Sequence, residues 1–89
     1  MGNIRELEQK ATLRILITLL DGEQTYTEVK TKVKAAQDTI NRALNNLINL
    51  GLIVEKFENK FPRRRLFNLT VKGRKIALLL KKIEEELKY

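Results

Sequence analysis

The sequence predicts a mainly helical α+β fold, and three observations support this prediction. The 89 residues suit one compact domain that spans residues 1–89. Apolar residues recur at helical spacing over 4–20, 27–34, 36–50 and 71–88. Residues 52–69 instead hold two stretches rich in β-branched and aromatic residues, separated by a loop that contains the only proline. We therefore expect helices on both sides of a hairpin.

The first helix, 4–20, is expected to end at Asp21-Gly22, because glycine readily takes the left-handed conformation that closes a helix. Its apolar residues form two opposite stripes: Ile4, Leu7, Ala11, Ile15 and Leu19 in one, and Leu13, Leu16, Ile17 and Leu20 in the other. An ordinary surface helix buries one stripe. Two stripes therefore indicate two packing partners, the helix's own core and a second subunit.

The next two helices, 27–34 and 36–50, are separated by a break near Lys34-Ala35. A short extended piece is expected before them, and Thr27 is expected to cap the first of the pair. Ala36 offers no side-chain cap to the second helix, so its capping falls to Asp38 or is weak.

Residues 52–57 and 65–69 are expected to pair in a two- or three-stranded sheet, joined by a loop in which Pro62 opposes ladder pairing. Thr70 is then expected to cap a last helix over 71–88. The resulting order is helix, short strand, helix, helix, strand, loop, strand, helix. This is the layout of a winged helix-turn-helix fold.

Composition narrows the possible functions. Lys and Arg total 18 against 11 Asp and Glu, and the net charge of +7 suits a polyanionic partner. The chain has no Cys and no His, which argues against disulfides, zinc sites and His-based catalysis. We therefore expect no enzyme activity, no metal and no cofactor. Without a membrane-length apolar run or a signal-peptide layout, the expected location is the cytoplasm.

The polar face of segment 36–50 is rich in amides and carries Arg42. Asn and Gln can pair with adenine and Arg with guanine in the major groove, so this face is a candidate base-reading surface. The candidate base readers are Gln37, Asn41, Arg42 and Asn45. Thr39 is a candidate phosphate contact. A solvated surface, or a surface that binds another protein, is the alternative interpretation of the same pattern.

The run from Thr39 to Glu55, TINRALNNLINLGLIVE, resembles the recognition-helix-to-wing segment of winged helix-turn-helix transcription regulators of the MarR, ArsR and PadR kind. Leu69-Thr70-x-x-Gly73 similarly resembles the start of the helix that follows the wing. The resemblance implies a transcription regulator. The chain departs from the pattern at Lys34, where Gly is frequent, at Ala36, where Ser is frequent, and at Asn41, which replaces Ser.

Basic residues gather at the hairpin loop, where a wing would meet DNA. The candidate backbone contacts there are Lys60, Arg63, Arg64 and Arg65, and further candidates are Thr25, Thr27 and Lys34. Arg64 and Arg65 should point to opposite faces, so only one of them is expected to contact DNA. We expect the Phe61 ring to fold under the hairpin, with an exposed wedge as the alternative. The alternative is that these cations only keep the loop soluble.

The last helix carries an apolar stripe with spacing close to that of a coiled-coil seam. With part of the first helix, it predicts a homodimer interface that contains Ile4, Leu7, Ala11, Ile76, Leu79, Leu80, Ile83 and Leu87. A monomer that buries both stripes within one chain is the alternative. The predicted function is a homodimeric regulator, in particular a repressor, that binds double-stranded DNA sequence-specifically. The rival functions are a protein-interaction module and a nonspecific architectural DNA binder.

Overall fold

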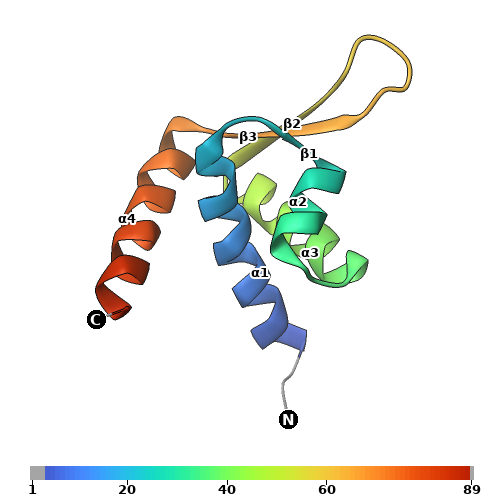
Figure 1. Cartoon of the computed structure of the whole chain (residues 1–89). Helices are drawn as coiled ribbons and strands as arrows, with labels where there is room; N and C mark the ends of the chain where they lie inside the picture. Colours follow the sequence, from blue (N-terminus) through green and yellow to red (C-terminus); the bar gives the residue numbers. More distant parts are fainter. Residues whose placement is uncertain (1–3, 89) are drawn as a thin grey trace.

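The computed structural model describes residues 4–88, with side chains from residue 9 onward. In chain order its elements are α1 (Ile4–Thr18), the 3-10 turn η1 (Leu19–Asp21), β1 (Gln24–Thr25), α2 (Tyr26–Val33), α3 (Gln37–Asn49), β2 (Ile53–Phe57), β3 (Arg65–Leu69) and α4 (Val71–Leu87). Figure 1 shows α2 and α3 on one side of α1 and α4 on the other. This architecture confirms the predicted mainly helical α+β fold with a wing.

The sheet has three antiparallel strands in the order β1-β3-β2. Strand β2 pairs with β3 from Ile53 opposite Leu69 to Phe57 opposite Arg65, and β1 adds two residues on the other edge of β3. Gln24 of β1 is buried, and its Nε2 donates a hydrogen bond of 2.6 Å to the carbonyl of Thr18. The short strand therefore joins the hairpin to the end of α1.

The core lies where α1, α2 and α3 meet the sheet. Its largest fully buried side chains come from six different elements: Ile15, Leu19, Val29, Ile40, Leu44, Leu47, Ile53 and Phe67. The buried residues of α3 have the spacing expected of one helix face, so the predicted apolar stripe of this helix faces the core. Packing on that face leaves the opposite side of α3 toward solvent.

Helix α1 does not divide into the two stripes that its sequence indicated. Leu16 is buried beside Ile15, although the sequence pattern places it in the opposite stripe. Leu13 is 45% exposed, and Ile17 and Leu20 are half-buried. One broad apolar face is therefore buried within the chain, because α4 as well as α3 packs against this helix.

Helix α2 begins one residue earlier than predicted because Thr25, not Thr27, is its cap. The Thr25 Oγ1 accepts a hydrogen bond from the Glu28 amide at 3.1 Å, and the Glu28 carboxylate accepts one from the Thr25 amide at 2.9 Å. This reciprocal capping box satisfies two backbone donors at the helix start. The helix ends at Val33, and the residue that follows, Lys34, has a φ of 56°, which places a non-glycine residue in the left-handed region.

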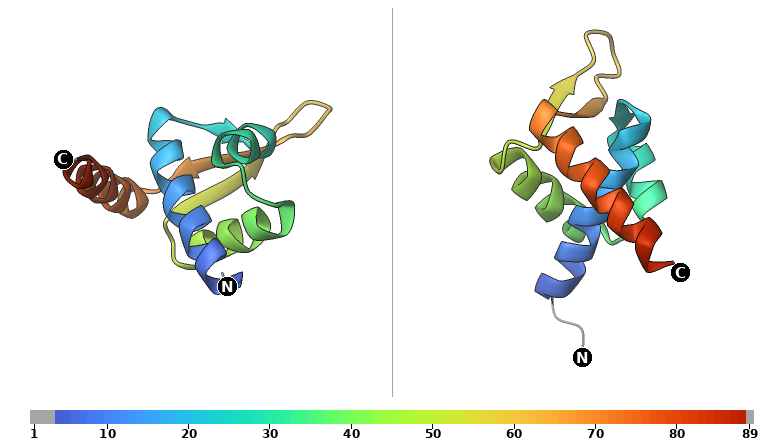
Figure 2. Two further views of the ribbon diagram at one scale, coloured as in Figure 1. Left: turned by 60° about the horizontal axis from the view of Figure 1, so that its bottom comes forward. Right: turned by 90° about the vertical axis from the view of Figure 1, so that its left-hand side faces the viewer.

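Helix α4 approaches the wing through small residues. A Cβ on Gly73 would lie 1.8 Å from the carbonyl oxygen of Leu52, so this position has no room for any side chain. Ala77, one turn later, is fully buried. The two views in Figure 2 show that α4 then runs beside α1 and away from α2 and α3. No helix within residues 4–88 is long and apolar enough to cross a membrane.

Candidate nucleic-acid interface

The outward face of α3 carries exposed polar side chains. Gln37, Arg42 and Asn45 are all exposed, and none of them makes a side-chain hydrogen bond or ion pair within residues 4–88. The buried residues on the other side of the helix fix its rotation, so Arg42 and Asn45 point away from the core. Gln37 is exposed because it lies in the first turn, three residues before the buried Ile40. Three of the four candidate base readers are therefore available to a ligand.

Asn41, the fourth candidate base reader, lies at the edge of this face. It is half-buried, and its Oδ1 is buried without a hydrogen-bond partner within the described residues. Bidentate pairing with adenine needs both the oxygen and the nitrogen of the amide. In this conformation the Asn41 oxygen is withdrawn from solvent, so the side chain must rotate before it can read a base.

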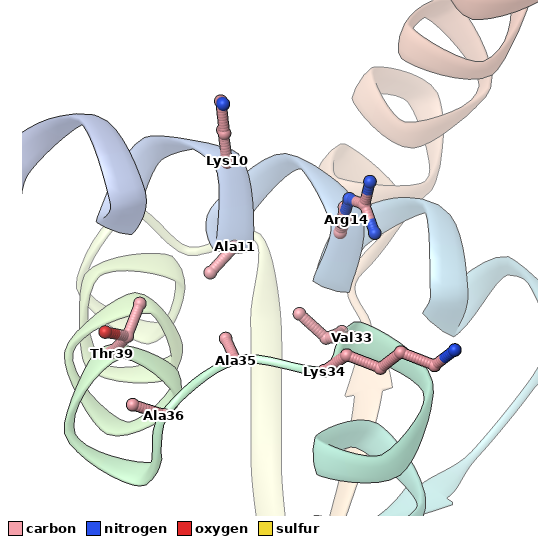
Figure 3. Close-up of a pocket in the computed structure, with 8 residues that line it drawn as sticks. All are labelled: Lys10, Ala11, Arg14, Val33, Lys34, Ala35, Ala36 and Thr39. Carbon is pink, nitrogen blue, oxygen red and sulfur yellow. The ribbon is translucent and has the colours of Figure 1, made fainter. Parts of the chain in front are cut away.

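The first turn of α3 borders a hollow of about 340 Å³ between α1 and the α2–α3 turn (Figure 3). Thr39 and Lys34 both line this hollow; Thr39 is half-buried, while the end of the exposed Lys34 side chain extends away from Thr39. The two candidate backbone contacts therefore point in different directions, and the amine of Lys34 is the more accessible of the two. Ala36 provides no side-chain cap to the helix, and Asp38 does not replace it.

The two candidate threonines at the start of α2 differ in whether their hydroxyl groups are free to contact DNA. The Thr25 hydroxyl already serves the capping box, and the residue is half-buried. Thr27 is exposed and does not cap the helix. Of the two, Thr27 is the one whose hydroxyl has no structural role within the described residues.

The basic residues of the wing fall into two classes. Arg64 makes a double ion pair with Glu58 across the neck of the loop, with Nη2 to Oε2 at 3.2 Å. Arg65 bonds Glu55 at 2.5 Å, and its guanidinium lies 5.2 Å from the ring centres of both Tyr26 and Phe67. Both side chains therefore hold the hairpin together.

Lys60 and Arg63 form the second class. Both are exposed, and neither has an ion-pair partner within residues 4–88. The hydrogen bond between Arg64 and Glu58 favours the charged form of both groups. It lowers the pKa of Glu58 and raises the pKa of Arg64, so both side chains stay ionised over the neutral range. The uncompensated charge of the loop is consequently concentrated at Lys60 and Arg63.

Phe61 corrects a prediction. Its ring is 94% exposed at the tip of the loop, rather than folded under the hairpin. It lies next to Lys60 and precedes Pro62 through a cis peptide bond. Figure 1 and the left view of Figure 2 both show the loop extending to the side on which α2 and α3 lie.

These elements meet the definition of a winged helix-turn-helix: two helices joined by a short turn, the second exposing a polar face, followed by a basic hairpin. The model of the HxlR-like helix-turn-helix family matches residues 6–88.

The chain belongs to the HxlR-like helix-turn-helix family. This membership places it among DNA-binding transcription regulators. Among curated proteins, none matches the sequence.

Solved structures with the same fold include three named regulators. The adhesin competence repressor of Streptococcus pyogenes superposes with a TM-score of 0.79 at 19% identity, over 86% of this chain and 57% of that one. A MarR-family regulator from Silicibacter pomeroyi gives 0.74 at 24% identity, over 82% and 49%. The reduced form of the regulator YodB from B. subtilis gives 0.73 at 16% identity, over 96% and 90%. At these identities the likeness concerns the fold.

The predicted dimer residues occupy different environments in this family member. The side chains of Ile4 and Leu7 lie outside the described residues. Ala11 is 3% exposed, and Ile76 and Leu80 are partly buried against the chain's own core. The exposed part of the predicted stripe is Leu79, Ile83 and Leu87, next to the exposed Leu78.

Proposed function

We propose that this protein is a sequence-specific repressor that binds double-stranded DNA as a homodimer. The observation that supports this proposal is that polar side chains of α3 and basic side chains of the wing are exposed on the same side of the molecule. The exposed side chains of Gln37, Arg42 and Asn45 on α3, and those of the wing cations Lys60 and Arg63, lack hydrogen-bond and ion-pair partners within residues 4–88. The loop that bears the cations extends to the side of the molecule on which α3 lies.

In the proposed complex, α3 enters the major groove. Arg42 would donate to O6 and N7 of a guanine, and Gln37 and Asn45 would pair with adenines. Thr27, Lys34 and Thr39 would contact phosphates beside α3, and Lys60 and Arg63 would contact the backbone through the wing. Arg64 and Arg65 would act indirectly, because their guanidinium groups are engaged with Glu58 and Glu55.

The exposed apolar side chains of α4 support the homodimer. Leu79, Ile83 and Leu87 are 62%, 55% and 80% exposed and lie on one face of a helix that stands apart from α2 and α3. A second copy would cover them and place two α3 helices in successive major grooves, about 34 Å apart. A dimer across the start of a gene blocks transcription sterically, and one structural neighbour is named a repressor.

The dimer is tested by the oligomeric state. Sedimentation of the whole chain should give twice the mass of one chain, and the combined change Leu79→Ser, Ile83→Ser and Leu87→Ser should give the mass of one chain. Far-UV circular dichroism monitors folding, which should persist because these side chains are exposed. A wild-type protein that sediments as one chain at the concentrations used for DNA binding contradicts the dimer.

DNA reading is tested by competition. A duplex selected from a random pool should outcompete random duplex for the wild-type protein, and Arg42→Ala should reduce that ratio roughly tenfold. Arg74→Ala is the matched control, since it removes the same charge from an exposed position of α4. An unchanged ratio for Arg42→Ala, or an equal loss for both variants, contradicts base reading by α3. A protein with no salt-dependent duplex binding contradicts DNA binding altogether.

A further inference from the structure

The tip of the wing exposes an aromatic ring that the rest of the fold does not use. Phe61 is 94% exposed, which is the largest value among the bulky apolar side chains that the structure describes. Burial of a phenyl ring is favourable, and a fold gains nothing from holding one in water at a loop tip. Such a side chain points to contact with a partner.

The loop that carries Phe61 is closed at its neck. The Glu58 amide donates to the Arg64 carbonyl at 3.0 Å, and the Arg64 amide donates to the Pro62 carbonyl at 3.0 Å. The Glu58–Arg64 ion pair closes the same neck through side chains. The ring is therefore held on a short, braced loop, which reduces the conformational entropy that binding would cost.

The charges around the ring favour nucleic acid as the partner. Lys60 precedes Phe61, Arg63 follows Pro62, and both cations are exposed without ion-pair partners in the described part of the chain. Phosphates could bind these two cations while stacked bases accept the ring. Minor-groove binding proteins combine these features when they insert an apolar wedge between base pairs.

We propose that Phe61 is a wedge that enters the DNA minor groove and partly unstacks one base step, with Lys60 and Arg63 on the flanking phosphates. This rests on the proposed DNA-binding function and adds a specificity determinant to it. Pyrimidine–purine steps unstack most easily, so the wedge adds a preference for such a step on either side of the bases that α3 reads.

Unstacking can be measured on the complex itself. A series of selected duplexes carries 2-aminopurine, an adenine analogue whose fluorescence rises when it is unstacked, at successive positions under the wing. The wild-type protein should raise the fluorescence at one step and leave the others unchanged. Phe61→Ala should abolish the rise, and Phe61→Leu, which keeps an apolar wedge, should retain part of it. No rise at any position overturns the wedge.

Affinity provides the second readout. Phe61→Ala should weaken binding to the selected duplex by roughly tenfold, as the loss of an aromatic contact with a base does. The slope of affinity against salt should not change, since no charge is removed. Phe57→Ala is the matched control, because Phe57 lies in the same hairpin and is 57% exposed.

The outcomes separate the wedge from the function on which it rests. Wild-type affinity for Phe61→Ala, or an equal loss for Phe57→Ala, overturns the wedge while DNA binding by the protein stands. Absence of duplex binding by the wild-type protein overturns both. Because the Phe61 ring is exposed, its replacement should leave the thermal unfolding midpoint unchanged, and this measurement excludes misfolding as the cause of a loss.

Discussion

Neighbouring arginines of the wing differ because of what surrounds each guanidinium. Arg64 pairs with Glu58, and Arg65 pairs with Glu55 while lying over two aromatic rings, whereas Arg63 has no such partner among residues 4–88. A guanidinium already held by a carboxylate must lose that bond before it can bind a phosphate. The electrostatic contact with DNA is therefore expected from Arg63.

This difference predicts how single changes in the wing affect salt dependence. Arg63→Ala should weaken binding to all duplexes alike and lower the slope of log affinity against log salt by about 1. Arg64→Ala should leave this slope unchanged, because its charge is neutralised within the loop. Fluorescence anisotropy at several salt concentrations measures both slopes. Equal reductions for the two variants would show that Arg64 leaves Glu58 to contact DNA.

Gly73 allows α4 to pack closely against the backbone at Leu52, just before β2. A Cβ at this position would lie 1.8 Å from the Leu52 carbonyl oxygen, which is backbone and cannot move alone. Gly73→Ala should therefore destabilise the fold by roughly 1–3 kcal/mol, the usual range for overpacking. Urea denaturation measures the loss, with Lys72→Ala on the exposed side of the helix as the control. Equal stability of the two variants would contradict the close approach.

At the scale of elements, the start of α2 depends on a reciprocal bond between Thr25 and Glu28. The Thr25 amide donates to the Glu28 carboxylate, and this bond, followed by the one from the Thr25 side chain, lowers the pKa of Glu28 below its ordinary value of 4.5. The lowered pKa means that the folded state favours the ionised carboxylate. This contribution to stability is complete above about pH 4.5 and is lost as the pH falls through the lower pKa of the folded state.

The matching prediction compares the wild-type protein with Glu28→Gln. Glutamine can still accept the Thr25 amide in a capping box but does not titrate. The wild-type advantage in thermal unfolding midpoint should therefore shrink as the pH falls below about 4.5 and through the lowered pKa of Glu28 in the folded state. Glu23 and Glu58 also have lowered pKa values, but they titrate in both proteins and cancel in the comparison. Parallel curves over this range would contradict the role of the Glu28 carboxylate.

The sequence predicted the helix-turn-helix and the wing because the apolar spacing of α3 and the β-rich stretches around Pro62 are local patterns. The α2 cap was misplaced, although Glu28 stands three residues after Thr25, the spacing of a capping box. The roles of Arg64 and Arg65 could not be read from the sequence. They depend on the hairpin register that brings Glu58 and Glu55 within bonding distance.

At the scale of the whole molecule, two surfaces lie on opposite sides of α1. Helix α3 and the wing loop lie on one side, and α4, which carries the exposed apolar residues, lies on the other. The sequence indicated the second surface as one continuous stripe. The structure divides that stripe, because Ile76 and Leu80 pack on the chain's own core while Leu79 and Ile83 remain exposed. Small residues such as Ala77 determine which face of α4 packs against the core. A sequence pattern based on large apolar residues does not show this.

If Arg42 reads a guanine in the major groove, this side chain must be energetically coupled to one guanine of the site, and a cycle of four affinities measures that coupling. The wild-type protein and Arg42→Ala are each titrated with a selected duplex and with the same duplex in which 7-deazaguanine replaces one guanine, which removes the N7 acceptor. At the guanine that Arg42 contacts, each single change should cost roughly tenfold, and the second change should add almost nothing to the first. If instead the two losses multiply independently at every guanine of the site, Arg42 does not read a guanine.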